Sequence, residues 1–214
     1  MEVSVVIPTL NEERFISRCL ESLLNQTVPP AEIIIVDAGS SDRTVELASR
    51  YTDKILYSPV ANVAYQRELG VAQAKGEFIL IADADTVFPP RTIELMLQNF
   101  ADPEVAAVTV NIAPLNPNLI THLNCWFRNL VTPRLTQRGC CFGFRRSALL
   151  SHEAFSVDGW QSWQDVFPLR AKLKGKVIKD NKIVVFTDIP PEQQLQTLAW
   201  IAFGALAGYA LLSL

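Results

Sequence analysis

The sequence predicts an α/β protein with a mostly parallel sheet flanked by helices. Short continuous runs of β-branched residues, such as Val3–Ile7 and Glu32–Val36, alternate along the chain with segments of helical periodicity. These runs are apolar at nearly every position, which is typical of strands buried on both faces of a parallel sheet. No linker interrupts the alternation, so we expect one domain over residues 1–190 and a hydrophobic segment over residues 191–214.

The first half of the chain contains most of the regular elements that the sequence predicts. Continuous apolar runs predict strands at Val3–Ile7, Glu32–Val36, Lys54–Tyr57, Phe78–Ala82 and Val105–Asn111. Apolar residues at helical spacing, bounded by Pro and Gly, predict helices over residues 12–25, 43–50, 62–75 and 89–100. We expect Asn11 to cap the first of these helices, because its side-chain oxygen can accept a hydrogen bond from the first turn.

The second half of the chain is less regular. Helices are expected over Asn118–Val131 and Gln164–Lys174. Shorter runs predict strands at Gly139–Phe144, Lys176–Ile178 and Ile183–Phe186. The four cysteines of the chain show no metal-ligand spacing and are expected to be reduced thiols of a cytosolic protein: Cys19, Cys125, Cys140 and Cys141.

Charge is distributed unevenly along the chain. The net charge of −3 argues against a general nucleic-acid binder. Residues 1–120 carry 8 basic and 16 acidic side chains, a net charge of 8 − 16 = −8, whereas residues 121–214 carry 11 and 6, a net charge of 11 − 6 = +5. The second half therefore has a basic surface that could face phosphates or anionic lipid, or that could simply be a solvated lysine-rich face.

The C-terminal segment predicts contact with a membrane. Residues 195–214, "LQTLAWIAFGALAGYALLSL", contain no charged side chain, and a helix of this length would be about 30 Å long, enough to cross a bilayer core. Lysines precede the segment and none follows it, so the positive-inside rule places the folded part at the cytoplasmic face of a membrane. A helix that spans the bilayer, a helix that lies in its interface, and a helix packed on the domain or in an oligomer all remain open.

Acidic and polar residues gather where the predicted strands end. The strand Phe78–Ala82 is followed directly by Asp83 and Asp85, and two carboxylates beside a buried strand repel each other unless a cation holds them. Polar loops containing Glu12 and Asp37 follow two other strands, and ligands of such sheets bind at the carboxyl ends of the strands. Although an exposed turn would explain Asp83-Ala84-Asp85 alone, its place at this edge indicates a Mg²⁺ or Mn²⁺ site completed by substrate phosphates.

Four sequence blocks carry a family resemblance. They are "VSVVIPTLNEERFISRCLESLLNQT", "EIIIVDAGSSDRT", "GEFILIADADT" and "GFRRSALL…WQDVFPLRAKLKGKV". In order and spacing they resemble the family 2 glycosyltransferases of the GT-A fold, over roughly residues 3–187. The resemblance implies transfer of a sugar from a nucleotide-diphosphate sugar, a UDP- or GDP-sugar, to an acceptor, with Mn²⁺ or Mg²⁺ as cofactor and inversion at the anomeric carbon.

The resemblance also assigns roles to individual residues. It places Asp37 against the nucleotide base, with Asp42 in the loop beside it, and it makes Asp83 and Asp85 the metal residues. The positions that it implies for nucleotide-sugar binding are Pro8, Thr9, Glu12, Asp37, Ser40, Arg67, Asp83 and Arg170. Where the family often has a further histidine ligand this chain reads Phe186-Thr187-Asp188, so Asp188 is a possible substitute.

Asp165 matches the position of the family's catalytic base. Inversion needs one base that deprotonates the acceptor hydroxyl on the face opposite the leaving group. The usual Glu-Asp pair reads Gln164-Asp165 here, which keeps the base but removes a neighbouring charge and leaves the acceptor type in doubt. Alternatively, Asp165 only caps the helix that begins there. Arg170, on the same predicted helix, would steer a phosphate.

Several functional alternatives stay open. The QxxRW signature of processive synthases is absent, which favours transfer of a single sugar. The acceptor could be a glycan, a protein or a lipid, and a dolichyl- or polyprenyl-phosphate sugar synthase is one specific form of the lipid case. A sugar-1-phosphate nucleotidyltransferase would need a Gly-rich loop that "IPTLNEER" lacks. A non-catalytic, membrane-tethered relative is the last alternative, although Asp37, Asp83, Asp85 and Asp165 are all intact.

Overall fold

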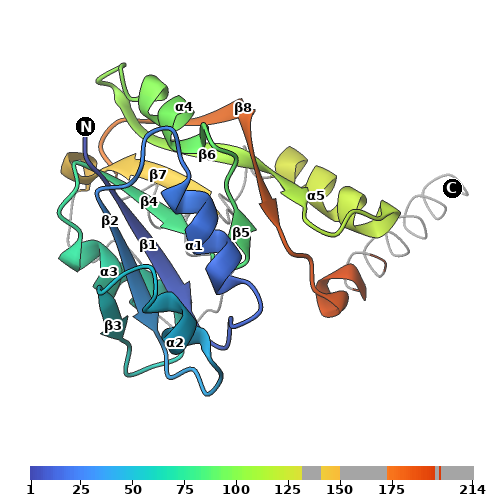
Figure 1. Ribbon diagram of the computed structural model, residues 1–214. Coiled ribbons are helices and arrows are strands. Elements are labelled where there is room, and N and C mark those ends of the chain that lie inside the picture. Colours follow the sequence, from blue (N-terminus) through green and yellow to red (C-terminus); the bar gives the residue numbers. More distant parts are fainter. Residues whose placement is uncertain (132–140, 150–172, 196–197, 199–214) are drawn as a thin grey trace, which may run out of the picture.

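The protein folds around one eight-stranded sheet, seen in a computed structural model that describes residues 1–131, 141–149, 173–195 and 198 (Figure 1). The strand order is β3-β2-β1-β4-β7-β6-β8-β5. The strands are β1 (Val3–Thr9), β2 (Glu32–Asp37), β3 (Ile55–Tyr57), β4 (Phe78–Ala82), β5 (Thr86–Val87), β6 (Val105–Pro114), β7 (Cys141–Arg145) and β8 (Lys176–Thr187). The helices are α1 (Ile16–Leu24), α2 (Thr44–Ala48), α3 (Val63–Gln73), α4 (Thr92–Asn99) and α5 (Leu119–Val131).

The sheet is mixed, with a parallel half and an irregular half. Strands β3, β2, β1 and β4 are mutually parallel, as the continuous apolar runs predict. Strand β7 lies antiparallel between β4 and β6, β8 is parallel to β6, and the short β5 is antiparallel to β8. The prediction of a mostly parallel sheet is therefore confirmed for β1 to β4. It fails for β5 and β7, which run antiparallel to their neighbours, because an apolar pattern does not encode strand direction.

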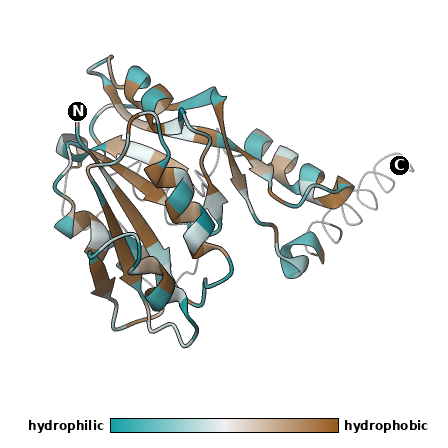
Figure 2. Cartoon of the chain, in the orientation of Figure 1, coloured by the Kyte–Doolittle hydropathy of each residue, from teal (hydrophilic) through white to brown (hydrophobic). Residues whose placement is uncertain are grey.

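Each face of the parallel half packs against helices. On one face, Val5 and Ile7 of β1 pack with the buried side of α1, which includes Ile16 and Leu20. On the other face, Val6 packs with the strand and α3 residues of a second core. Successive residues of a strand point to opposite faces, so one apolar run supplies both cores. The strands are accordingly among the most hydrophobic parts of the chain in Figure 2.

Two sequence predictions are wrong, and a third concerns residues that the structure does not describe. Asn11 does not cap the first helix: α1 begins at Ile16, and Asn11 takes a left-handed conformation (φ 57°) in the preceding loop. The two short strands predicted at Lys176–Ile178 and Ile183–Phe186 are one strand, β8, whose pairing with β6 is irregular near its middle. The helix predicted over Gln164–Lys174 lies almost entirely outside the described residues.

The C-terminal prediction is not tested by the fold. Within the part of the chain that the structure describes, no helix combines the length and the hydrophobicity needed to cross a bilayer. Residues 191–195 are helical, but the predicted membrane segment 195–214 falls outside the description except at residues 195 and 198.

Helix α3 approaches the sheet closely at Gly70. A Cβ atom added to Gly70 would lie 2.3 Å from Cγ1 of Val6, a fully buried core residue, and 3.0 Å from Cγ2 of Val36. A Cβ contact of 2.3 Å essentially never occurs, so the absence of a Cβ at position 70 lets α3 sit this close to β1. The approach brings Gln66 and Arg67, one turn earlier in α3, to the carboxyl ends of the strands.

We expect Gly70→Ala to lower the free energy of unfolding by about 1 to 2 kcal/mol, because the overpacking cost exceeds the helix-propensity gain of about 1 kcal/mol. Val6→Ala removes the methyl group that the new Cβ would meet, so Gly70→Ala should cost less in that background than in the wild type. Urea unfolding of the two single variants and the double variant measures this coupling. Strictly additive effects would contradict the close contact.

Candidate functional site

The carboxylate of Asp37 organises the loop after β2. It is 1% exposed and accepts four hydrogen bonds: from Thr9 Oγ1 at 3.0 Å, Gly39 N at 2.9 Å, Ser40 N at 2.8 Å and Ser40 Oγ at 2.5 Å. Gly39 has a φ of 86°, which side-chain-bearing residues rarely adopt, and this turn lets two successive backbone N–H groups face the same carboxylate. Thr9, Asp37 and Ser40 are therefore brought together, as the sequence analysis expected.

The loop after β1 is fastened to the loop after β2 by backbone-to-side-chain hydrogen bonds. Asn11 N donates to Ser40 Oγ (2.9 Å), and Ser41 N donates back to Asn11 Oδ1 (2.9 Å), which explains why Asn11 is unavailable as a helix cap. Glu12 N donates to Thr44 Oγ1 at 2.7 Å. These bonds place Glu12 beside the Asp37 loop.

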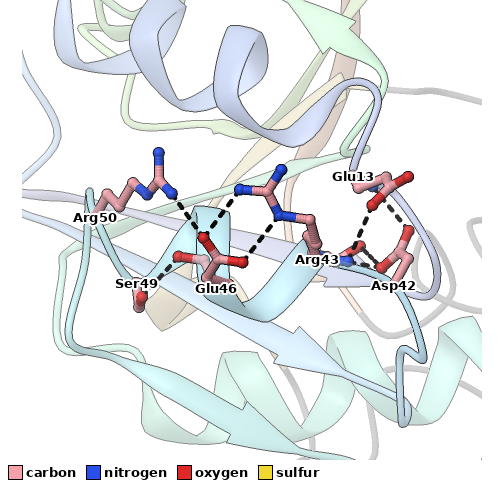
Figure 3. A network of polar contacts seen from close by, with 7 residues as sticks. Glu13, Asp42, Arg43, Glu46, Ser49 and Arg50 are labelled. Carbon is pink, nitrogen blue, oxygen red and sulfur yellow. Dashed lines mark hydrogen bonds and ion pairs between the residues drawn. The ribbon is translucent and has the colours of Figure 1, made fainter.

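Asp42 holds the outer side of the same pair of loops. Its carboxylate accepts from Thr44 N at 2.9 Å and from Glu13 N at 3.1 Å, while Glu13 accepts from Arg43 N at 3.1 Å (Figure 3). Arg43 in turn pairs with Glu46 at 2.9 Å. The Asp42 carboxylate thus makes its hydrogen bonds within the two loops and stabilises them. Pro8 is buried in β1, opposite Val36 of β2, and is part of the sheet that carries the loops.

Helix α3 presents two polar side chains to the strand ends. Gln66 Nε2 donates to the carbonyl oxygens of Thr9 (2.9 Å) and Val36 (2.6 Å), which ties the ends of β1 and β2 to the helix. Arg67 Nη2 donates to Asp83 Oδ1 at 2.9 Å, and the arginine side chain is buried while Asp83 is partly exposed. A buried guanidinium is held by such a carboxylate partner, so Arg67 fixes Asp83 at the end of β4.

Three carboxylates crowd the region between β1 and β4. Burial, followed by the charges of Asp85 and Asp83, raises the pKa of Glu12 to about 7. Burial, followed by the charge of Asp83, also raises the pKa of Asp85 to about 7. Burial and the neighbouring carboxylates both disfavour the charged forms of Glu12 and Asp85, so a cation bound here would stabilise those forms.

The end of β8 closes the acidic cluster from the other side. Thr187 Oγ1 donates to Asp85 Oδ2 at 3.3 Å, and Thr187 pairs with Thr86 of β5 in the sheet. Asp188, the suggested substitute for a histidine ligand, accepts from Asn116 Nδ2 at 2.6 Å and is close enough to help raise the pKa of Asp85. The sequence analysis named Asp188 but missed Thr187, which no sequence signal marks.

Arg128 of α5 is a second residue that the sequence analysis missed. Its positive charge lowers the pKa of Asp85, against the larger effects of burial and Asp83, so the guanidinium lies near the acidic cluster. The side chain is half-buried. A single arginine among apolar and neutral polar residues of a helix forms no recognisable motif, and only the packing of α5 on β6 brings it to the site.

The donor set fits a hard divalent cation. Among the described residues, no group of three or more His, Cys, Asp or Glu side chains is arranged to hold a metal ion by itself. The oxygen atoms of Asp83 and Asp85 are nevertheless the ligand type that Mg²⁺ and Mn²⁺ prefer. Burial and the charge of Asp83 raise the pKa of Asp85, and a bound cation would oppose both effects. Asp165 and Arg170, the predicted base and phosphate-steering residue, lie outside the described residues.

Comparison with known proteins identifies relatives of the chain. The family model described as glycosyl transferase family 2 matches residues 4–155. The chain is 34% identical to chondroitin synthase of Pasteurella multocida over 122 residues, which are 54% of this chain and 13% of that protein. It is 31% identical to the glycosyltransferase GlyG of Streptococcus pneumoniae over 115 residues, which are 51% of this chain and 38% of that protein. The matched part is thus well under half the length of these relatives.

Solved structures share the fold at low sequence identity. Staphylococcus aureus TarS matches with a TM-score of 0.64 and 19% identity, over 95% of this chain and 39% of that chain. Glucosyl-3-phosphoglycerate synthase from Mycobacterium tuberculosis, in complex with Mn²⁺, UDP and phosphoglyceric acid, matches with a TM-score of 0.64 and 17% identity. That match covers 92% of this chain and 76% of that chain. These matches confirm the predicted GT-A type of fold.

The acidic cluster predicts a pH dependence of stability. The pKa of Asp85 is about 7 in the folded protein and about 4 in an unfolded chain, so the carboxyl group stabilises the fold below pH 4 and loses that contribution as the pH rises through 7. Without divalent cations, we expect the wild type to lose about 1 to 3 kcal/mol more than Asp85→Asn between pH 5 and pH 8. Urea unfolding at several pH values measures the difference.

Asp53→Asn is the matched control, because it removes one carboxylate from an exposed position. Its pH profile should run parallel to that of the wild type. Identical profiles for Asp85→Asn and Asp53→Asn would mean that Asp85 is not held in an unfavourable charged state.

Proposed function

The chain belongs to glycosyl transferase family 2, and on this premise we propose that it transfers a single sugar from a UDP- or GDP-sugar to an acceptor. The observation that carries the proposal is the cluster of Glu12, Asp83 and Asp85, whose excess negative charge lies at the carboxyl ends of the parallel strands. Ligands of open α/β sheets bind at this edge, and a nucleotide diphosphate with its cation would supply the missing positive charge.

The Asp37 loop would form the nucleoside side of the donor site. Because Asp37 is buried and its carboxylate already accepts four hydrogen bonds, we propose that it shapes the loop instead of reading the base directly. The nucleoside would then contact the backbone and side chains of the two loops that follow β1 and β2, which include Glu12 and Ser40. Arg67 would act through Asp83, which it holds in place.

Asp83 and Asp85 would hold a Mn²⁺ or Mg²⁺ ion together with the donor's diphosphate. The mycobacterial synthase with the same fold is seen with Mn²⁺ and UDP, which supports this assignment. When bound, such a cation stabilises the negative charge that develops on the departing nucleotide diphosphate. Thr187 would orient Asp85 through its hydroxyl hydrogen bond.

Asp165 would deprotonate the acceptor hydroxyl, so that the oxygen attacks the anomeric carbon from the side opposite the diphosphate and inverts its configuration. An acceptor that is itself a phosphate needs little help from a base, and in that case Asp165 would orient the acceptor. Arg170 would then steer the acceptor phosphate or the leaving diphosphate. The family resemblance of "WQDVFPLRAKLKGKV" supports both assignments.

A lipid-linked acceptor at the cytoplasmic face of a membrane is the version we favour. The uncharged segment 195–214 and the net charge of +5 over residues 121–214 support it (11 − 6). A dolichyl- or polyprenyl-phosphate sugar synthase is its most specific form. A glycan acceptor is the alternative, supported by the similarity to chondroitin synthase.

A donor screen tests the proposed class. Purified protein is incubated with UDP-, GDP- and dTDP-sugars and Mn²⁺ or Mg²⁺, with and without a polyprenyl phosphate, and nucleotide release is measured. We expect metal-dependent release from one donor, increased by the lipid, and loss of both release and metal-dependent donor binding in Asp85→Ala. Asp53→Ala should leave both unchanged. Folded protein that binds and releases no donor would favour the non-catalytic alternative.

The role of Asp165 is tested by its amide variant. Asp165→Asn removes the proton acceptor and keeps the shape of the side chain, so kcat for a hydroxyl acceptor should fall by about a hundredfold to ten-thousandfold. The donor dissociation constant should not change, because the base contacts the acceptor. Steady-state kinetics and donor calorimetry measure the two quantities, and Asp158→Asn, a nearby acid in the sequence, serves as the control. An unchanged kcat would remove Asp165 from the chemistry.

A further inference from the structure

Helix α5 is clamped to the sheet near its C-terminal end. Asn129 Oδ1 accepts from Ile112 N of β6 at 3.0 Å, and Asn129 Nδ2 donates to Ile112 O at 2.8 Å. Lys179 Nζ of β8 donates to the carbonyl oxygen of Asn129 at 2.7 Å. Two neighbouring strands therefore hold this end of the helix through one residue, which restricts rotation of α5 about its own axis.

Arg128 lies on the side of α5 that faces the sheet. Thr121 and Cys125 are 0% and 3% exposed, so they mark the buried side of the helix. Arg128 follows them by seven and three residues, and residues at these spacings share one side of an α-helix. Arg128 is itself half-buried, in agreement with this position. Cys125 belongs to the same hydrophobic core as Ala84, which separates the two aspartates of the acidic cluster.

The strands that hold this end of α5 lead to the acidic cluster. Ile112, which carries the Asn129 clamp, is followed two residues later by Pro114, and Pro114 pairs with Thr187 of β8. Thr187 Oγ1 donates to Asp85 Oδ2 at 3.3 Å. The clamp of α5 is therefore only two residues along β6 from the strand pair that holds Asp85.

The charge of Arg128 reaches the acidic cluster, in agreement with this packing. Burial and the charge of Asp83 raise the pKa of Asp85, whereas the hydrogen bond from Thr187 and the charge of Arg128 lower it. Arg67 of α3 donates to Asp83 at 2.9 Å. Helices α3 and α5 thus each bring one arginine to the edge where Asp83 and Asp85 lie.

A guanidinium beside a cation site suits a phosphate ligand. Arginine stays charged at every physiological pH, and its planar donors can make two parallel hydrogen bonds to phosphate oxygens. A cation held by two carboxylates completes its coordination with substrate phosphates, which would bring a diphosphate close to Asp85. Arg128 would then lie next to an anion that carries more negative charge than one divalent cation neutralises.

We propose that Arg128 binds the diphosphate of the nucleotide donor and stabilises it as the leaving group. The inference rests on the proposed function, because it requires a nucleotide diphosphate at the acidic edge of the sheet. In the free protein, Arg128 offsets part of the negative charge around Asp85. In the donor complex, its guanidinium donates hydrogen bonds to the phosphate oxygens.

The charge that Arg128 stabilises arises in the transfer step. The bond between the anomeric carbon and the diphosphate oxygen breaks, and its electron pair stays on that oxygen, so the diphosphate gains one negative charge. The acceptor oxygen forms the new bond to the anomeric carbon, and the acceptor proton passes to the base. A guanidinium already in place at the diphosphate interacts more strongly with the departing group than with the intact donor, which lowers the barrier.

Two binding measurements with opposite expected signs test this role. Arg128→Gln removes the charge and keeps a polar side chain. Mn²⁺ alone should bind the variant about threefold or more tightly than the wild type, because a positive charge near the cation site is lost. With excess Mn²⁺, UDP or GDP, whichever the wild type binds, should bind about tenfold or more weakly, because a charge-assisted contact is lost. Electron paramagnetic resonance measures the first affinity and calorimetry the second.

Two further variants complete the test. Arg128→Lys keeps the charge and loses the planar pair of donors, so the affinity for Mn²⁺ should stay at the wild-type value while nucleotide binding weakens about threefold or more. This variant also carries the test if Arg128→Gln does not fold. Arg91→Gln is the matched control, because Arg91 lies exposed on the surface and pairs with Glu94 of α4 at 2.8 Å. It should change neither affinity.

The possible results separate the inference from the proposed function. Tighter Mn²⁺ binding with unchanged nucleotide binding would make Arg128 a charge partner of the acidic cluster only and overturn its role at the diphosphate. Unchanged values of both affinities, or an equal loss of both together with a lower free energy of unfolding, would overturn it as well. In each of these cases the wild type still binds nucleotide, and the donor site stands. Wild-type protein that binds neither UDP nor GDP would overturn the proposed function and the inference together.

Discussion

The gathering of partly buried carboxylates at one edge of the sheet is the constraint on which the rest of the structure depends. Parallel strands bring their carboxyl ends to the same edge, so the acids that follow β1 and β4 cannot avoid one another. Burial and mutual repulsion raise the pKa values of Glu12 and Asp85 to about 7. Keeping such groups together lowers the stability of the folded protein, and strongly shifted pKa values of this kind are typical of functional sites.

Hydrogen bonds and one close contact connect the surrounding elements to this edge. The close contact of Gly70 with Val6 lets α3 reach the strand ends, where Gln66 ties β1 to β2 and Arg67 fixes Asp83. The four hydrogen bonds accepted by Asp37 fix the neighbouring loop in the same way. Loops fixed in this way beside an acidic cluster would suit the nucleotide-diphosphate donor and cation that we propose.

The sequence predicts the parallel half of the fold well, because Val3–Ile7 and Phe78–Ala82 are apolar without interruption and end in polar residues. It also places the acidic residues at one edge. It does not predict the direction of β7 or the unbroken length of β8, which depend on where the chain re-enters the sheet. The sequence does not predict the roles of Arg128 and Thr187, because only tertiary packing brings these residues close to Asp85.

The most direct test of the central claim is the binding of Mn²⁺, measured by electron paramagnetic resonance with and without UDP or GDP. If the acidic edge is a shared site for a cation and a diphosphate, Mn²⁺ should bind weakly alone. One of the two nucleotides should then raise its affinity by about tenfold or more, which corresponds to a coupling free energy of about 1.4 kcal/mol. Equal Mn²⁺ affinity with and without either nucleotide would contradict the account.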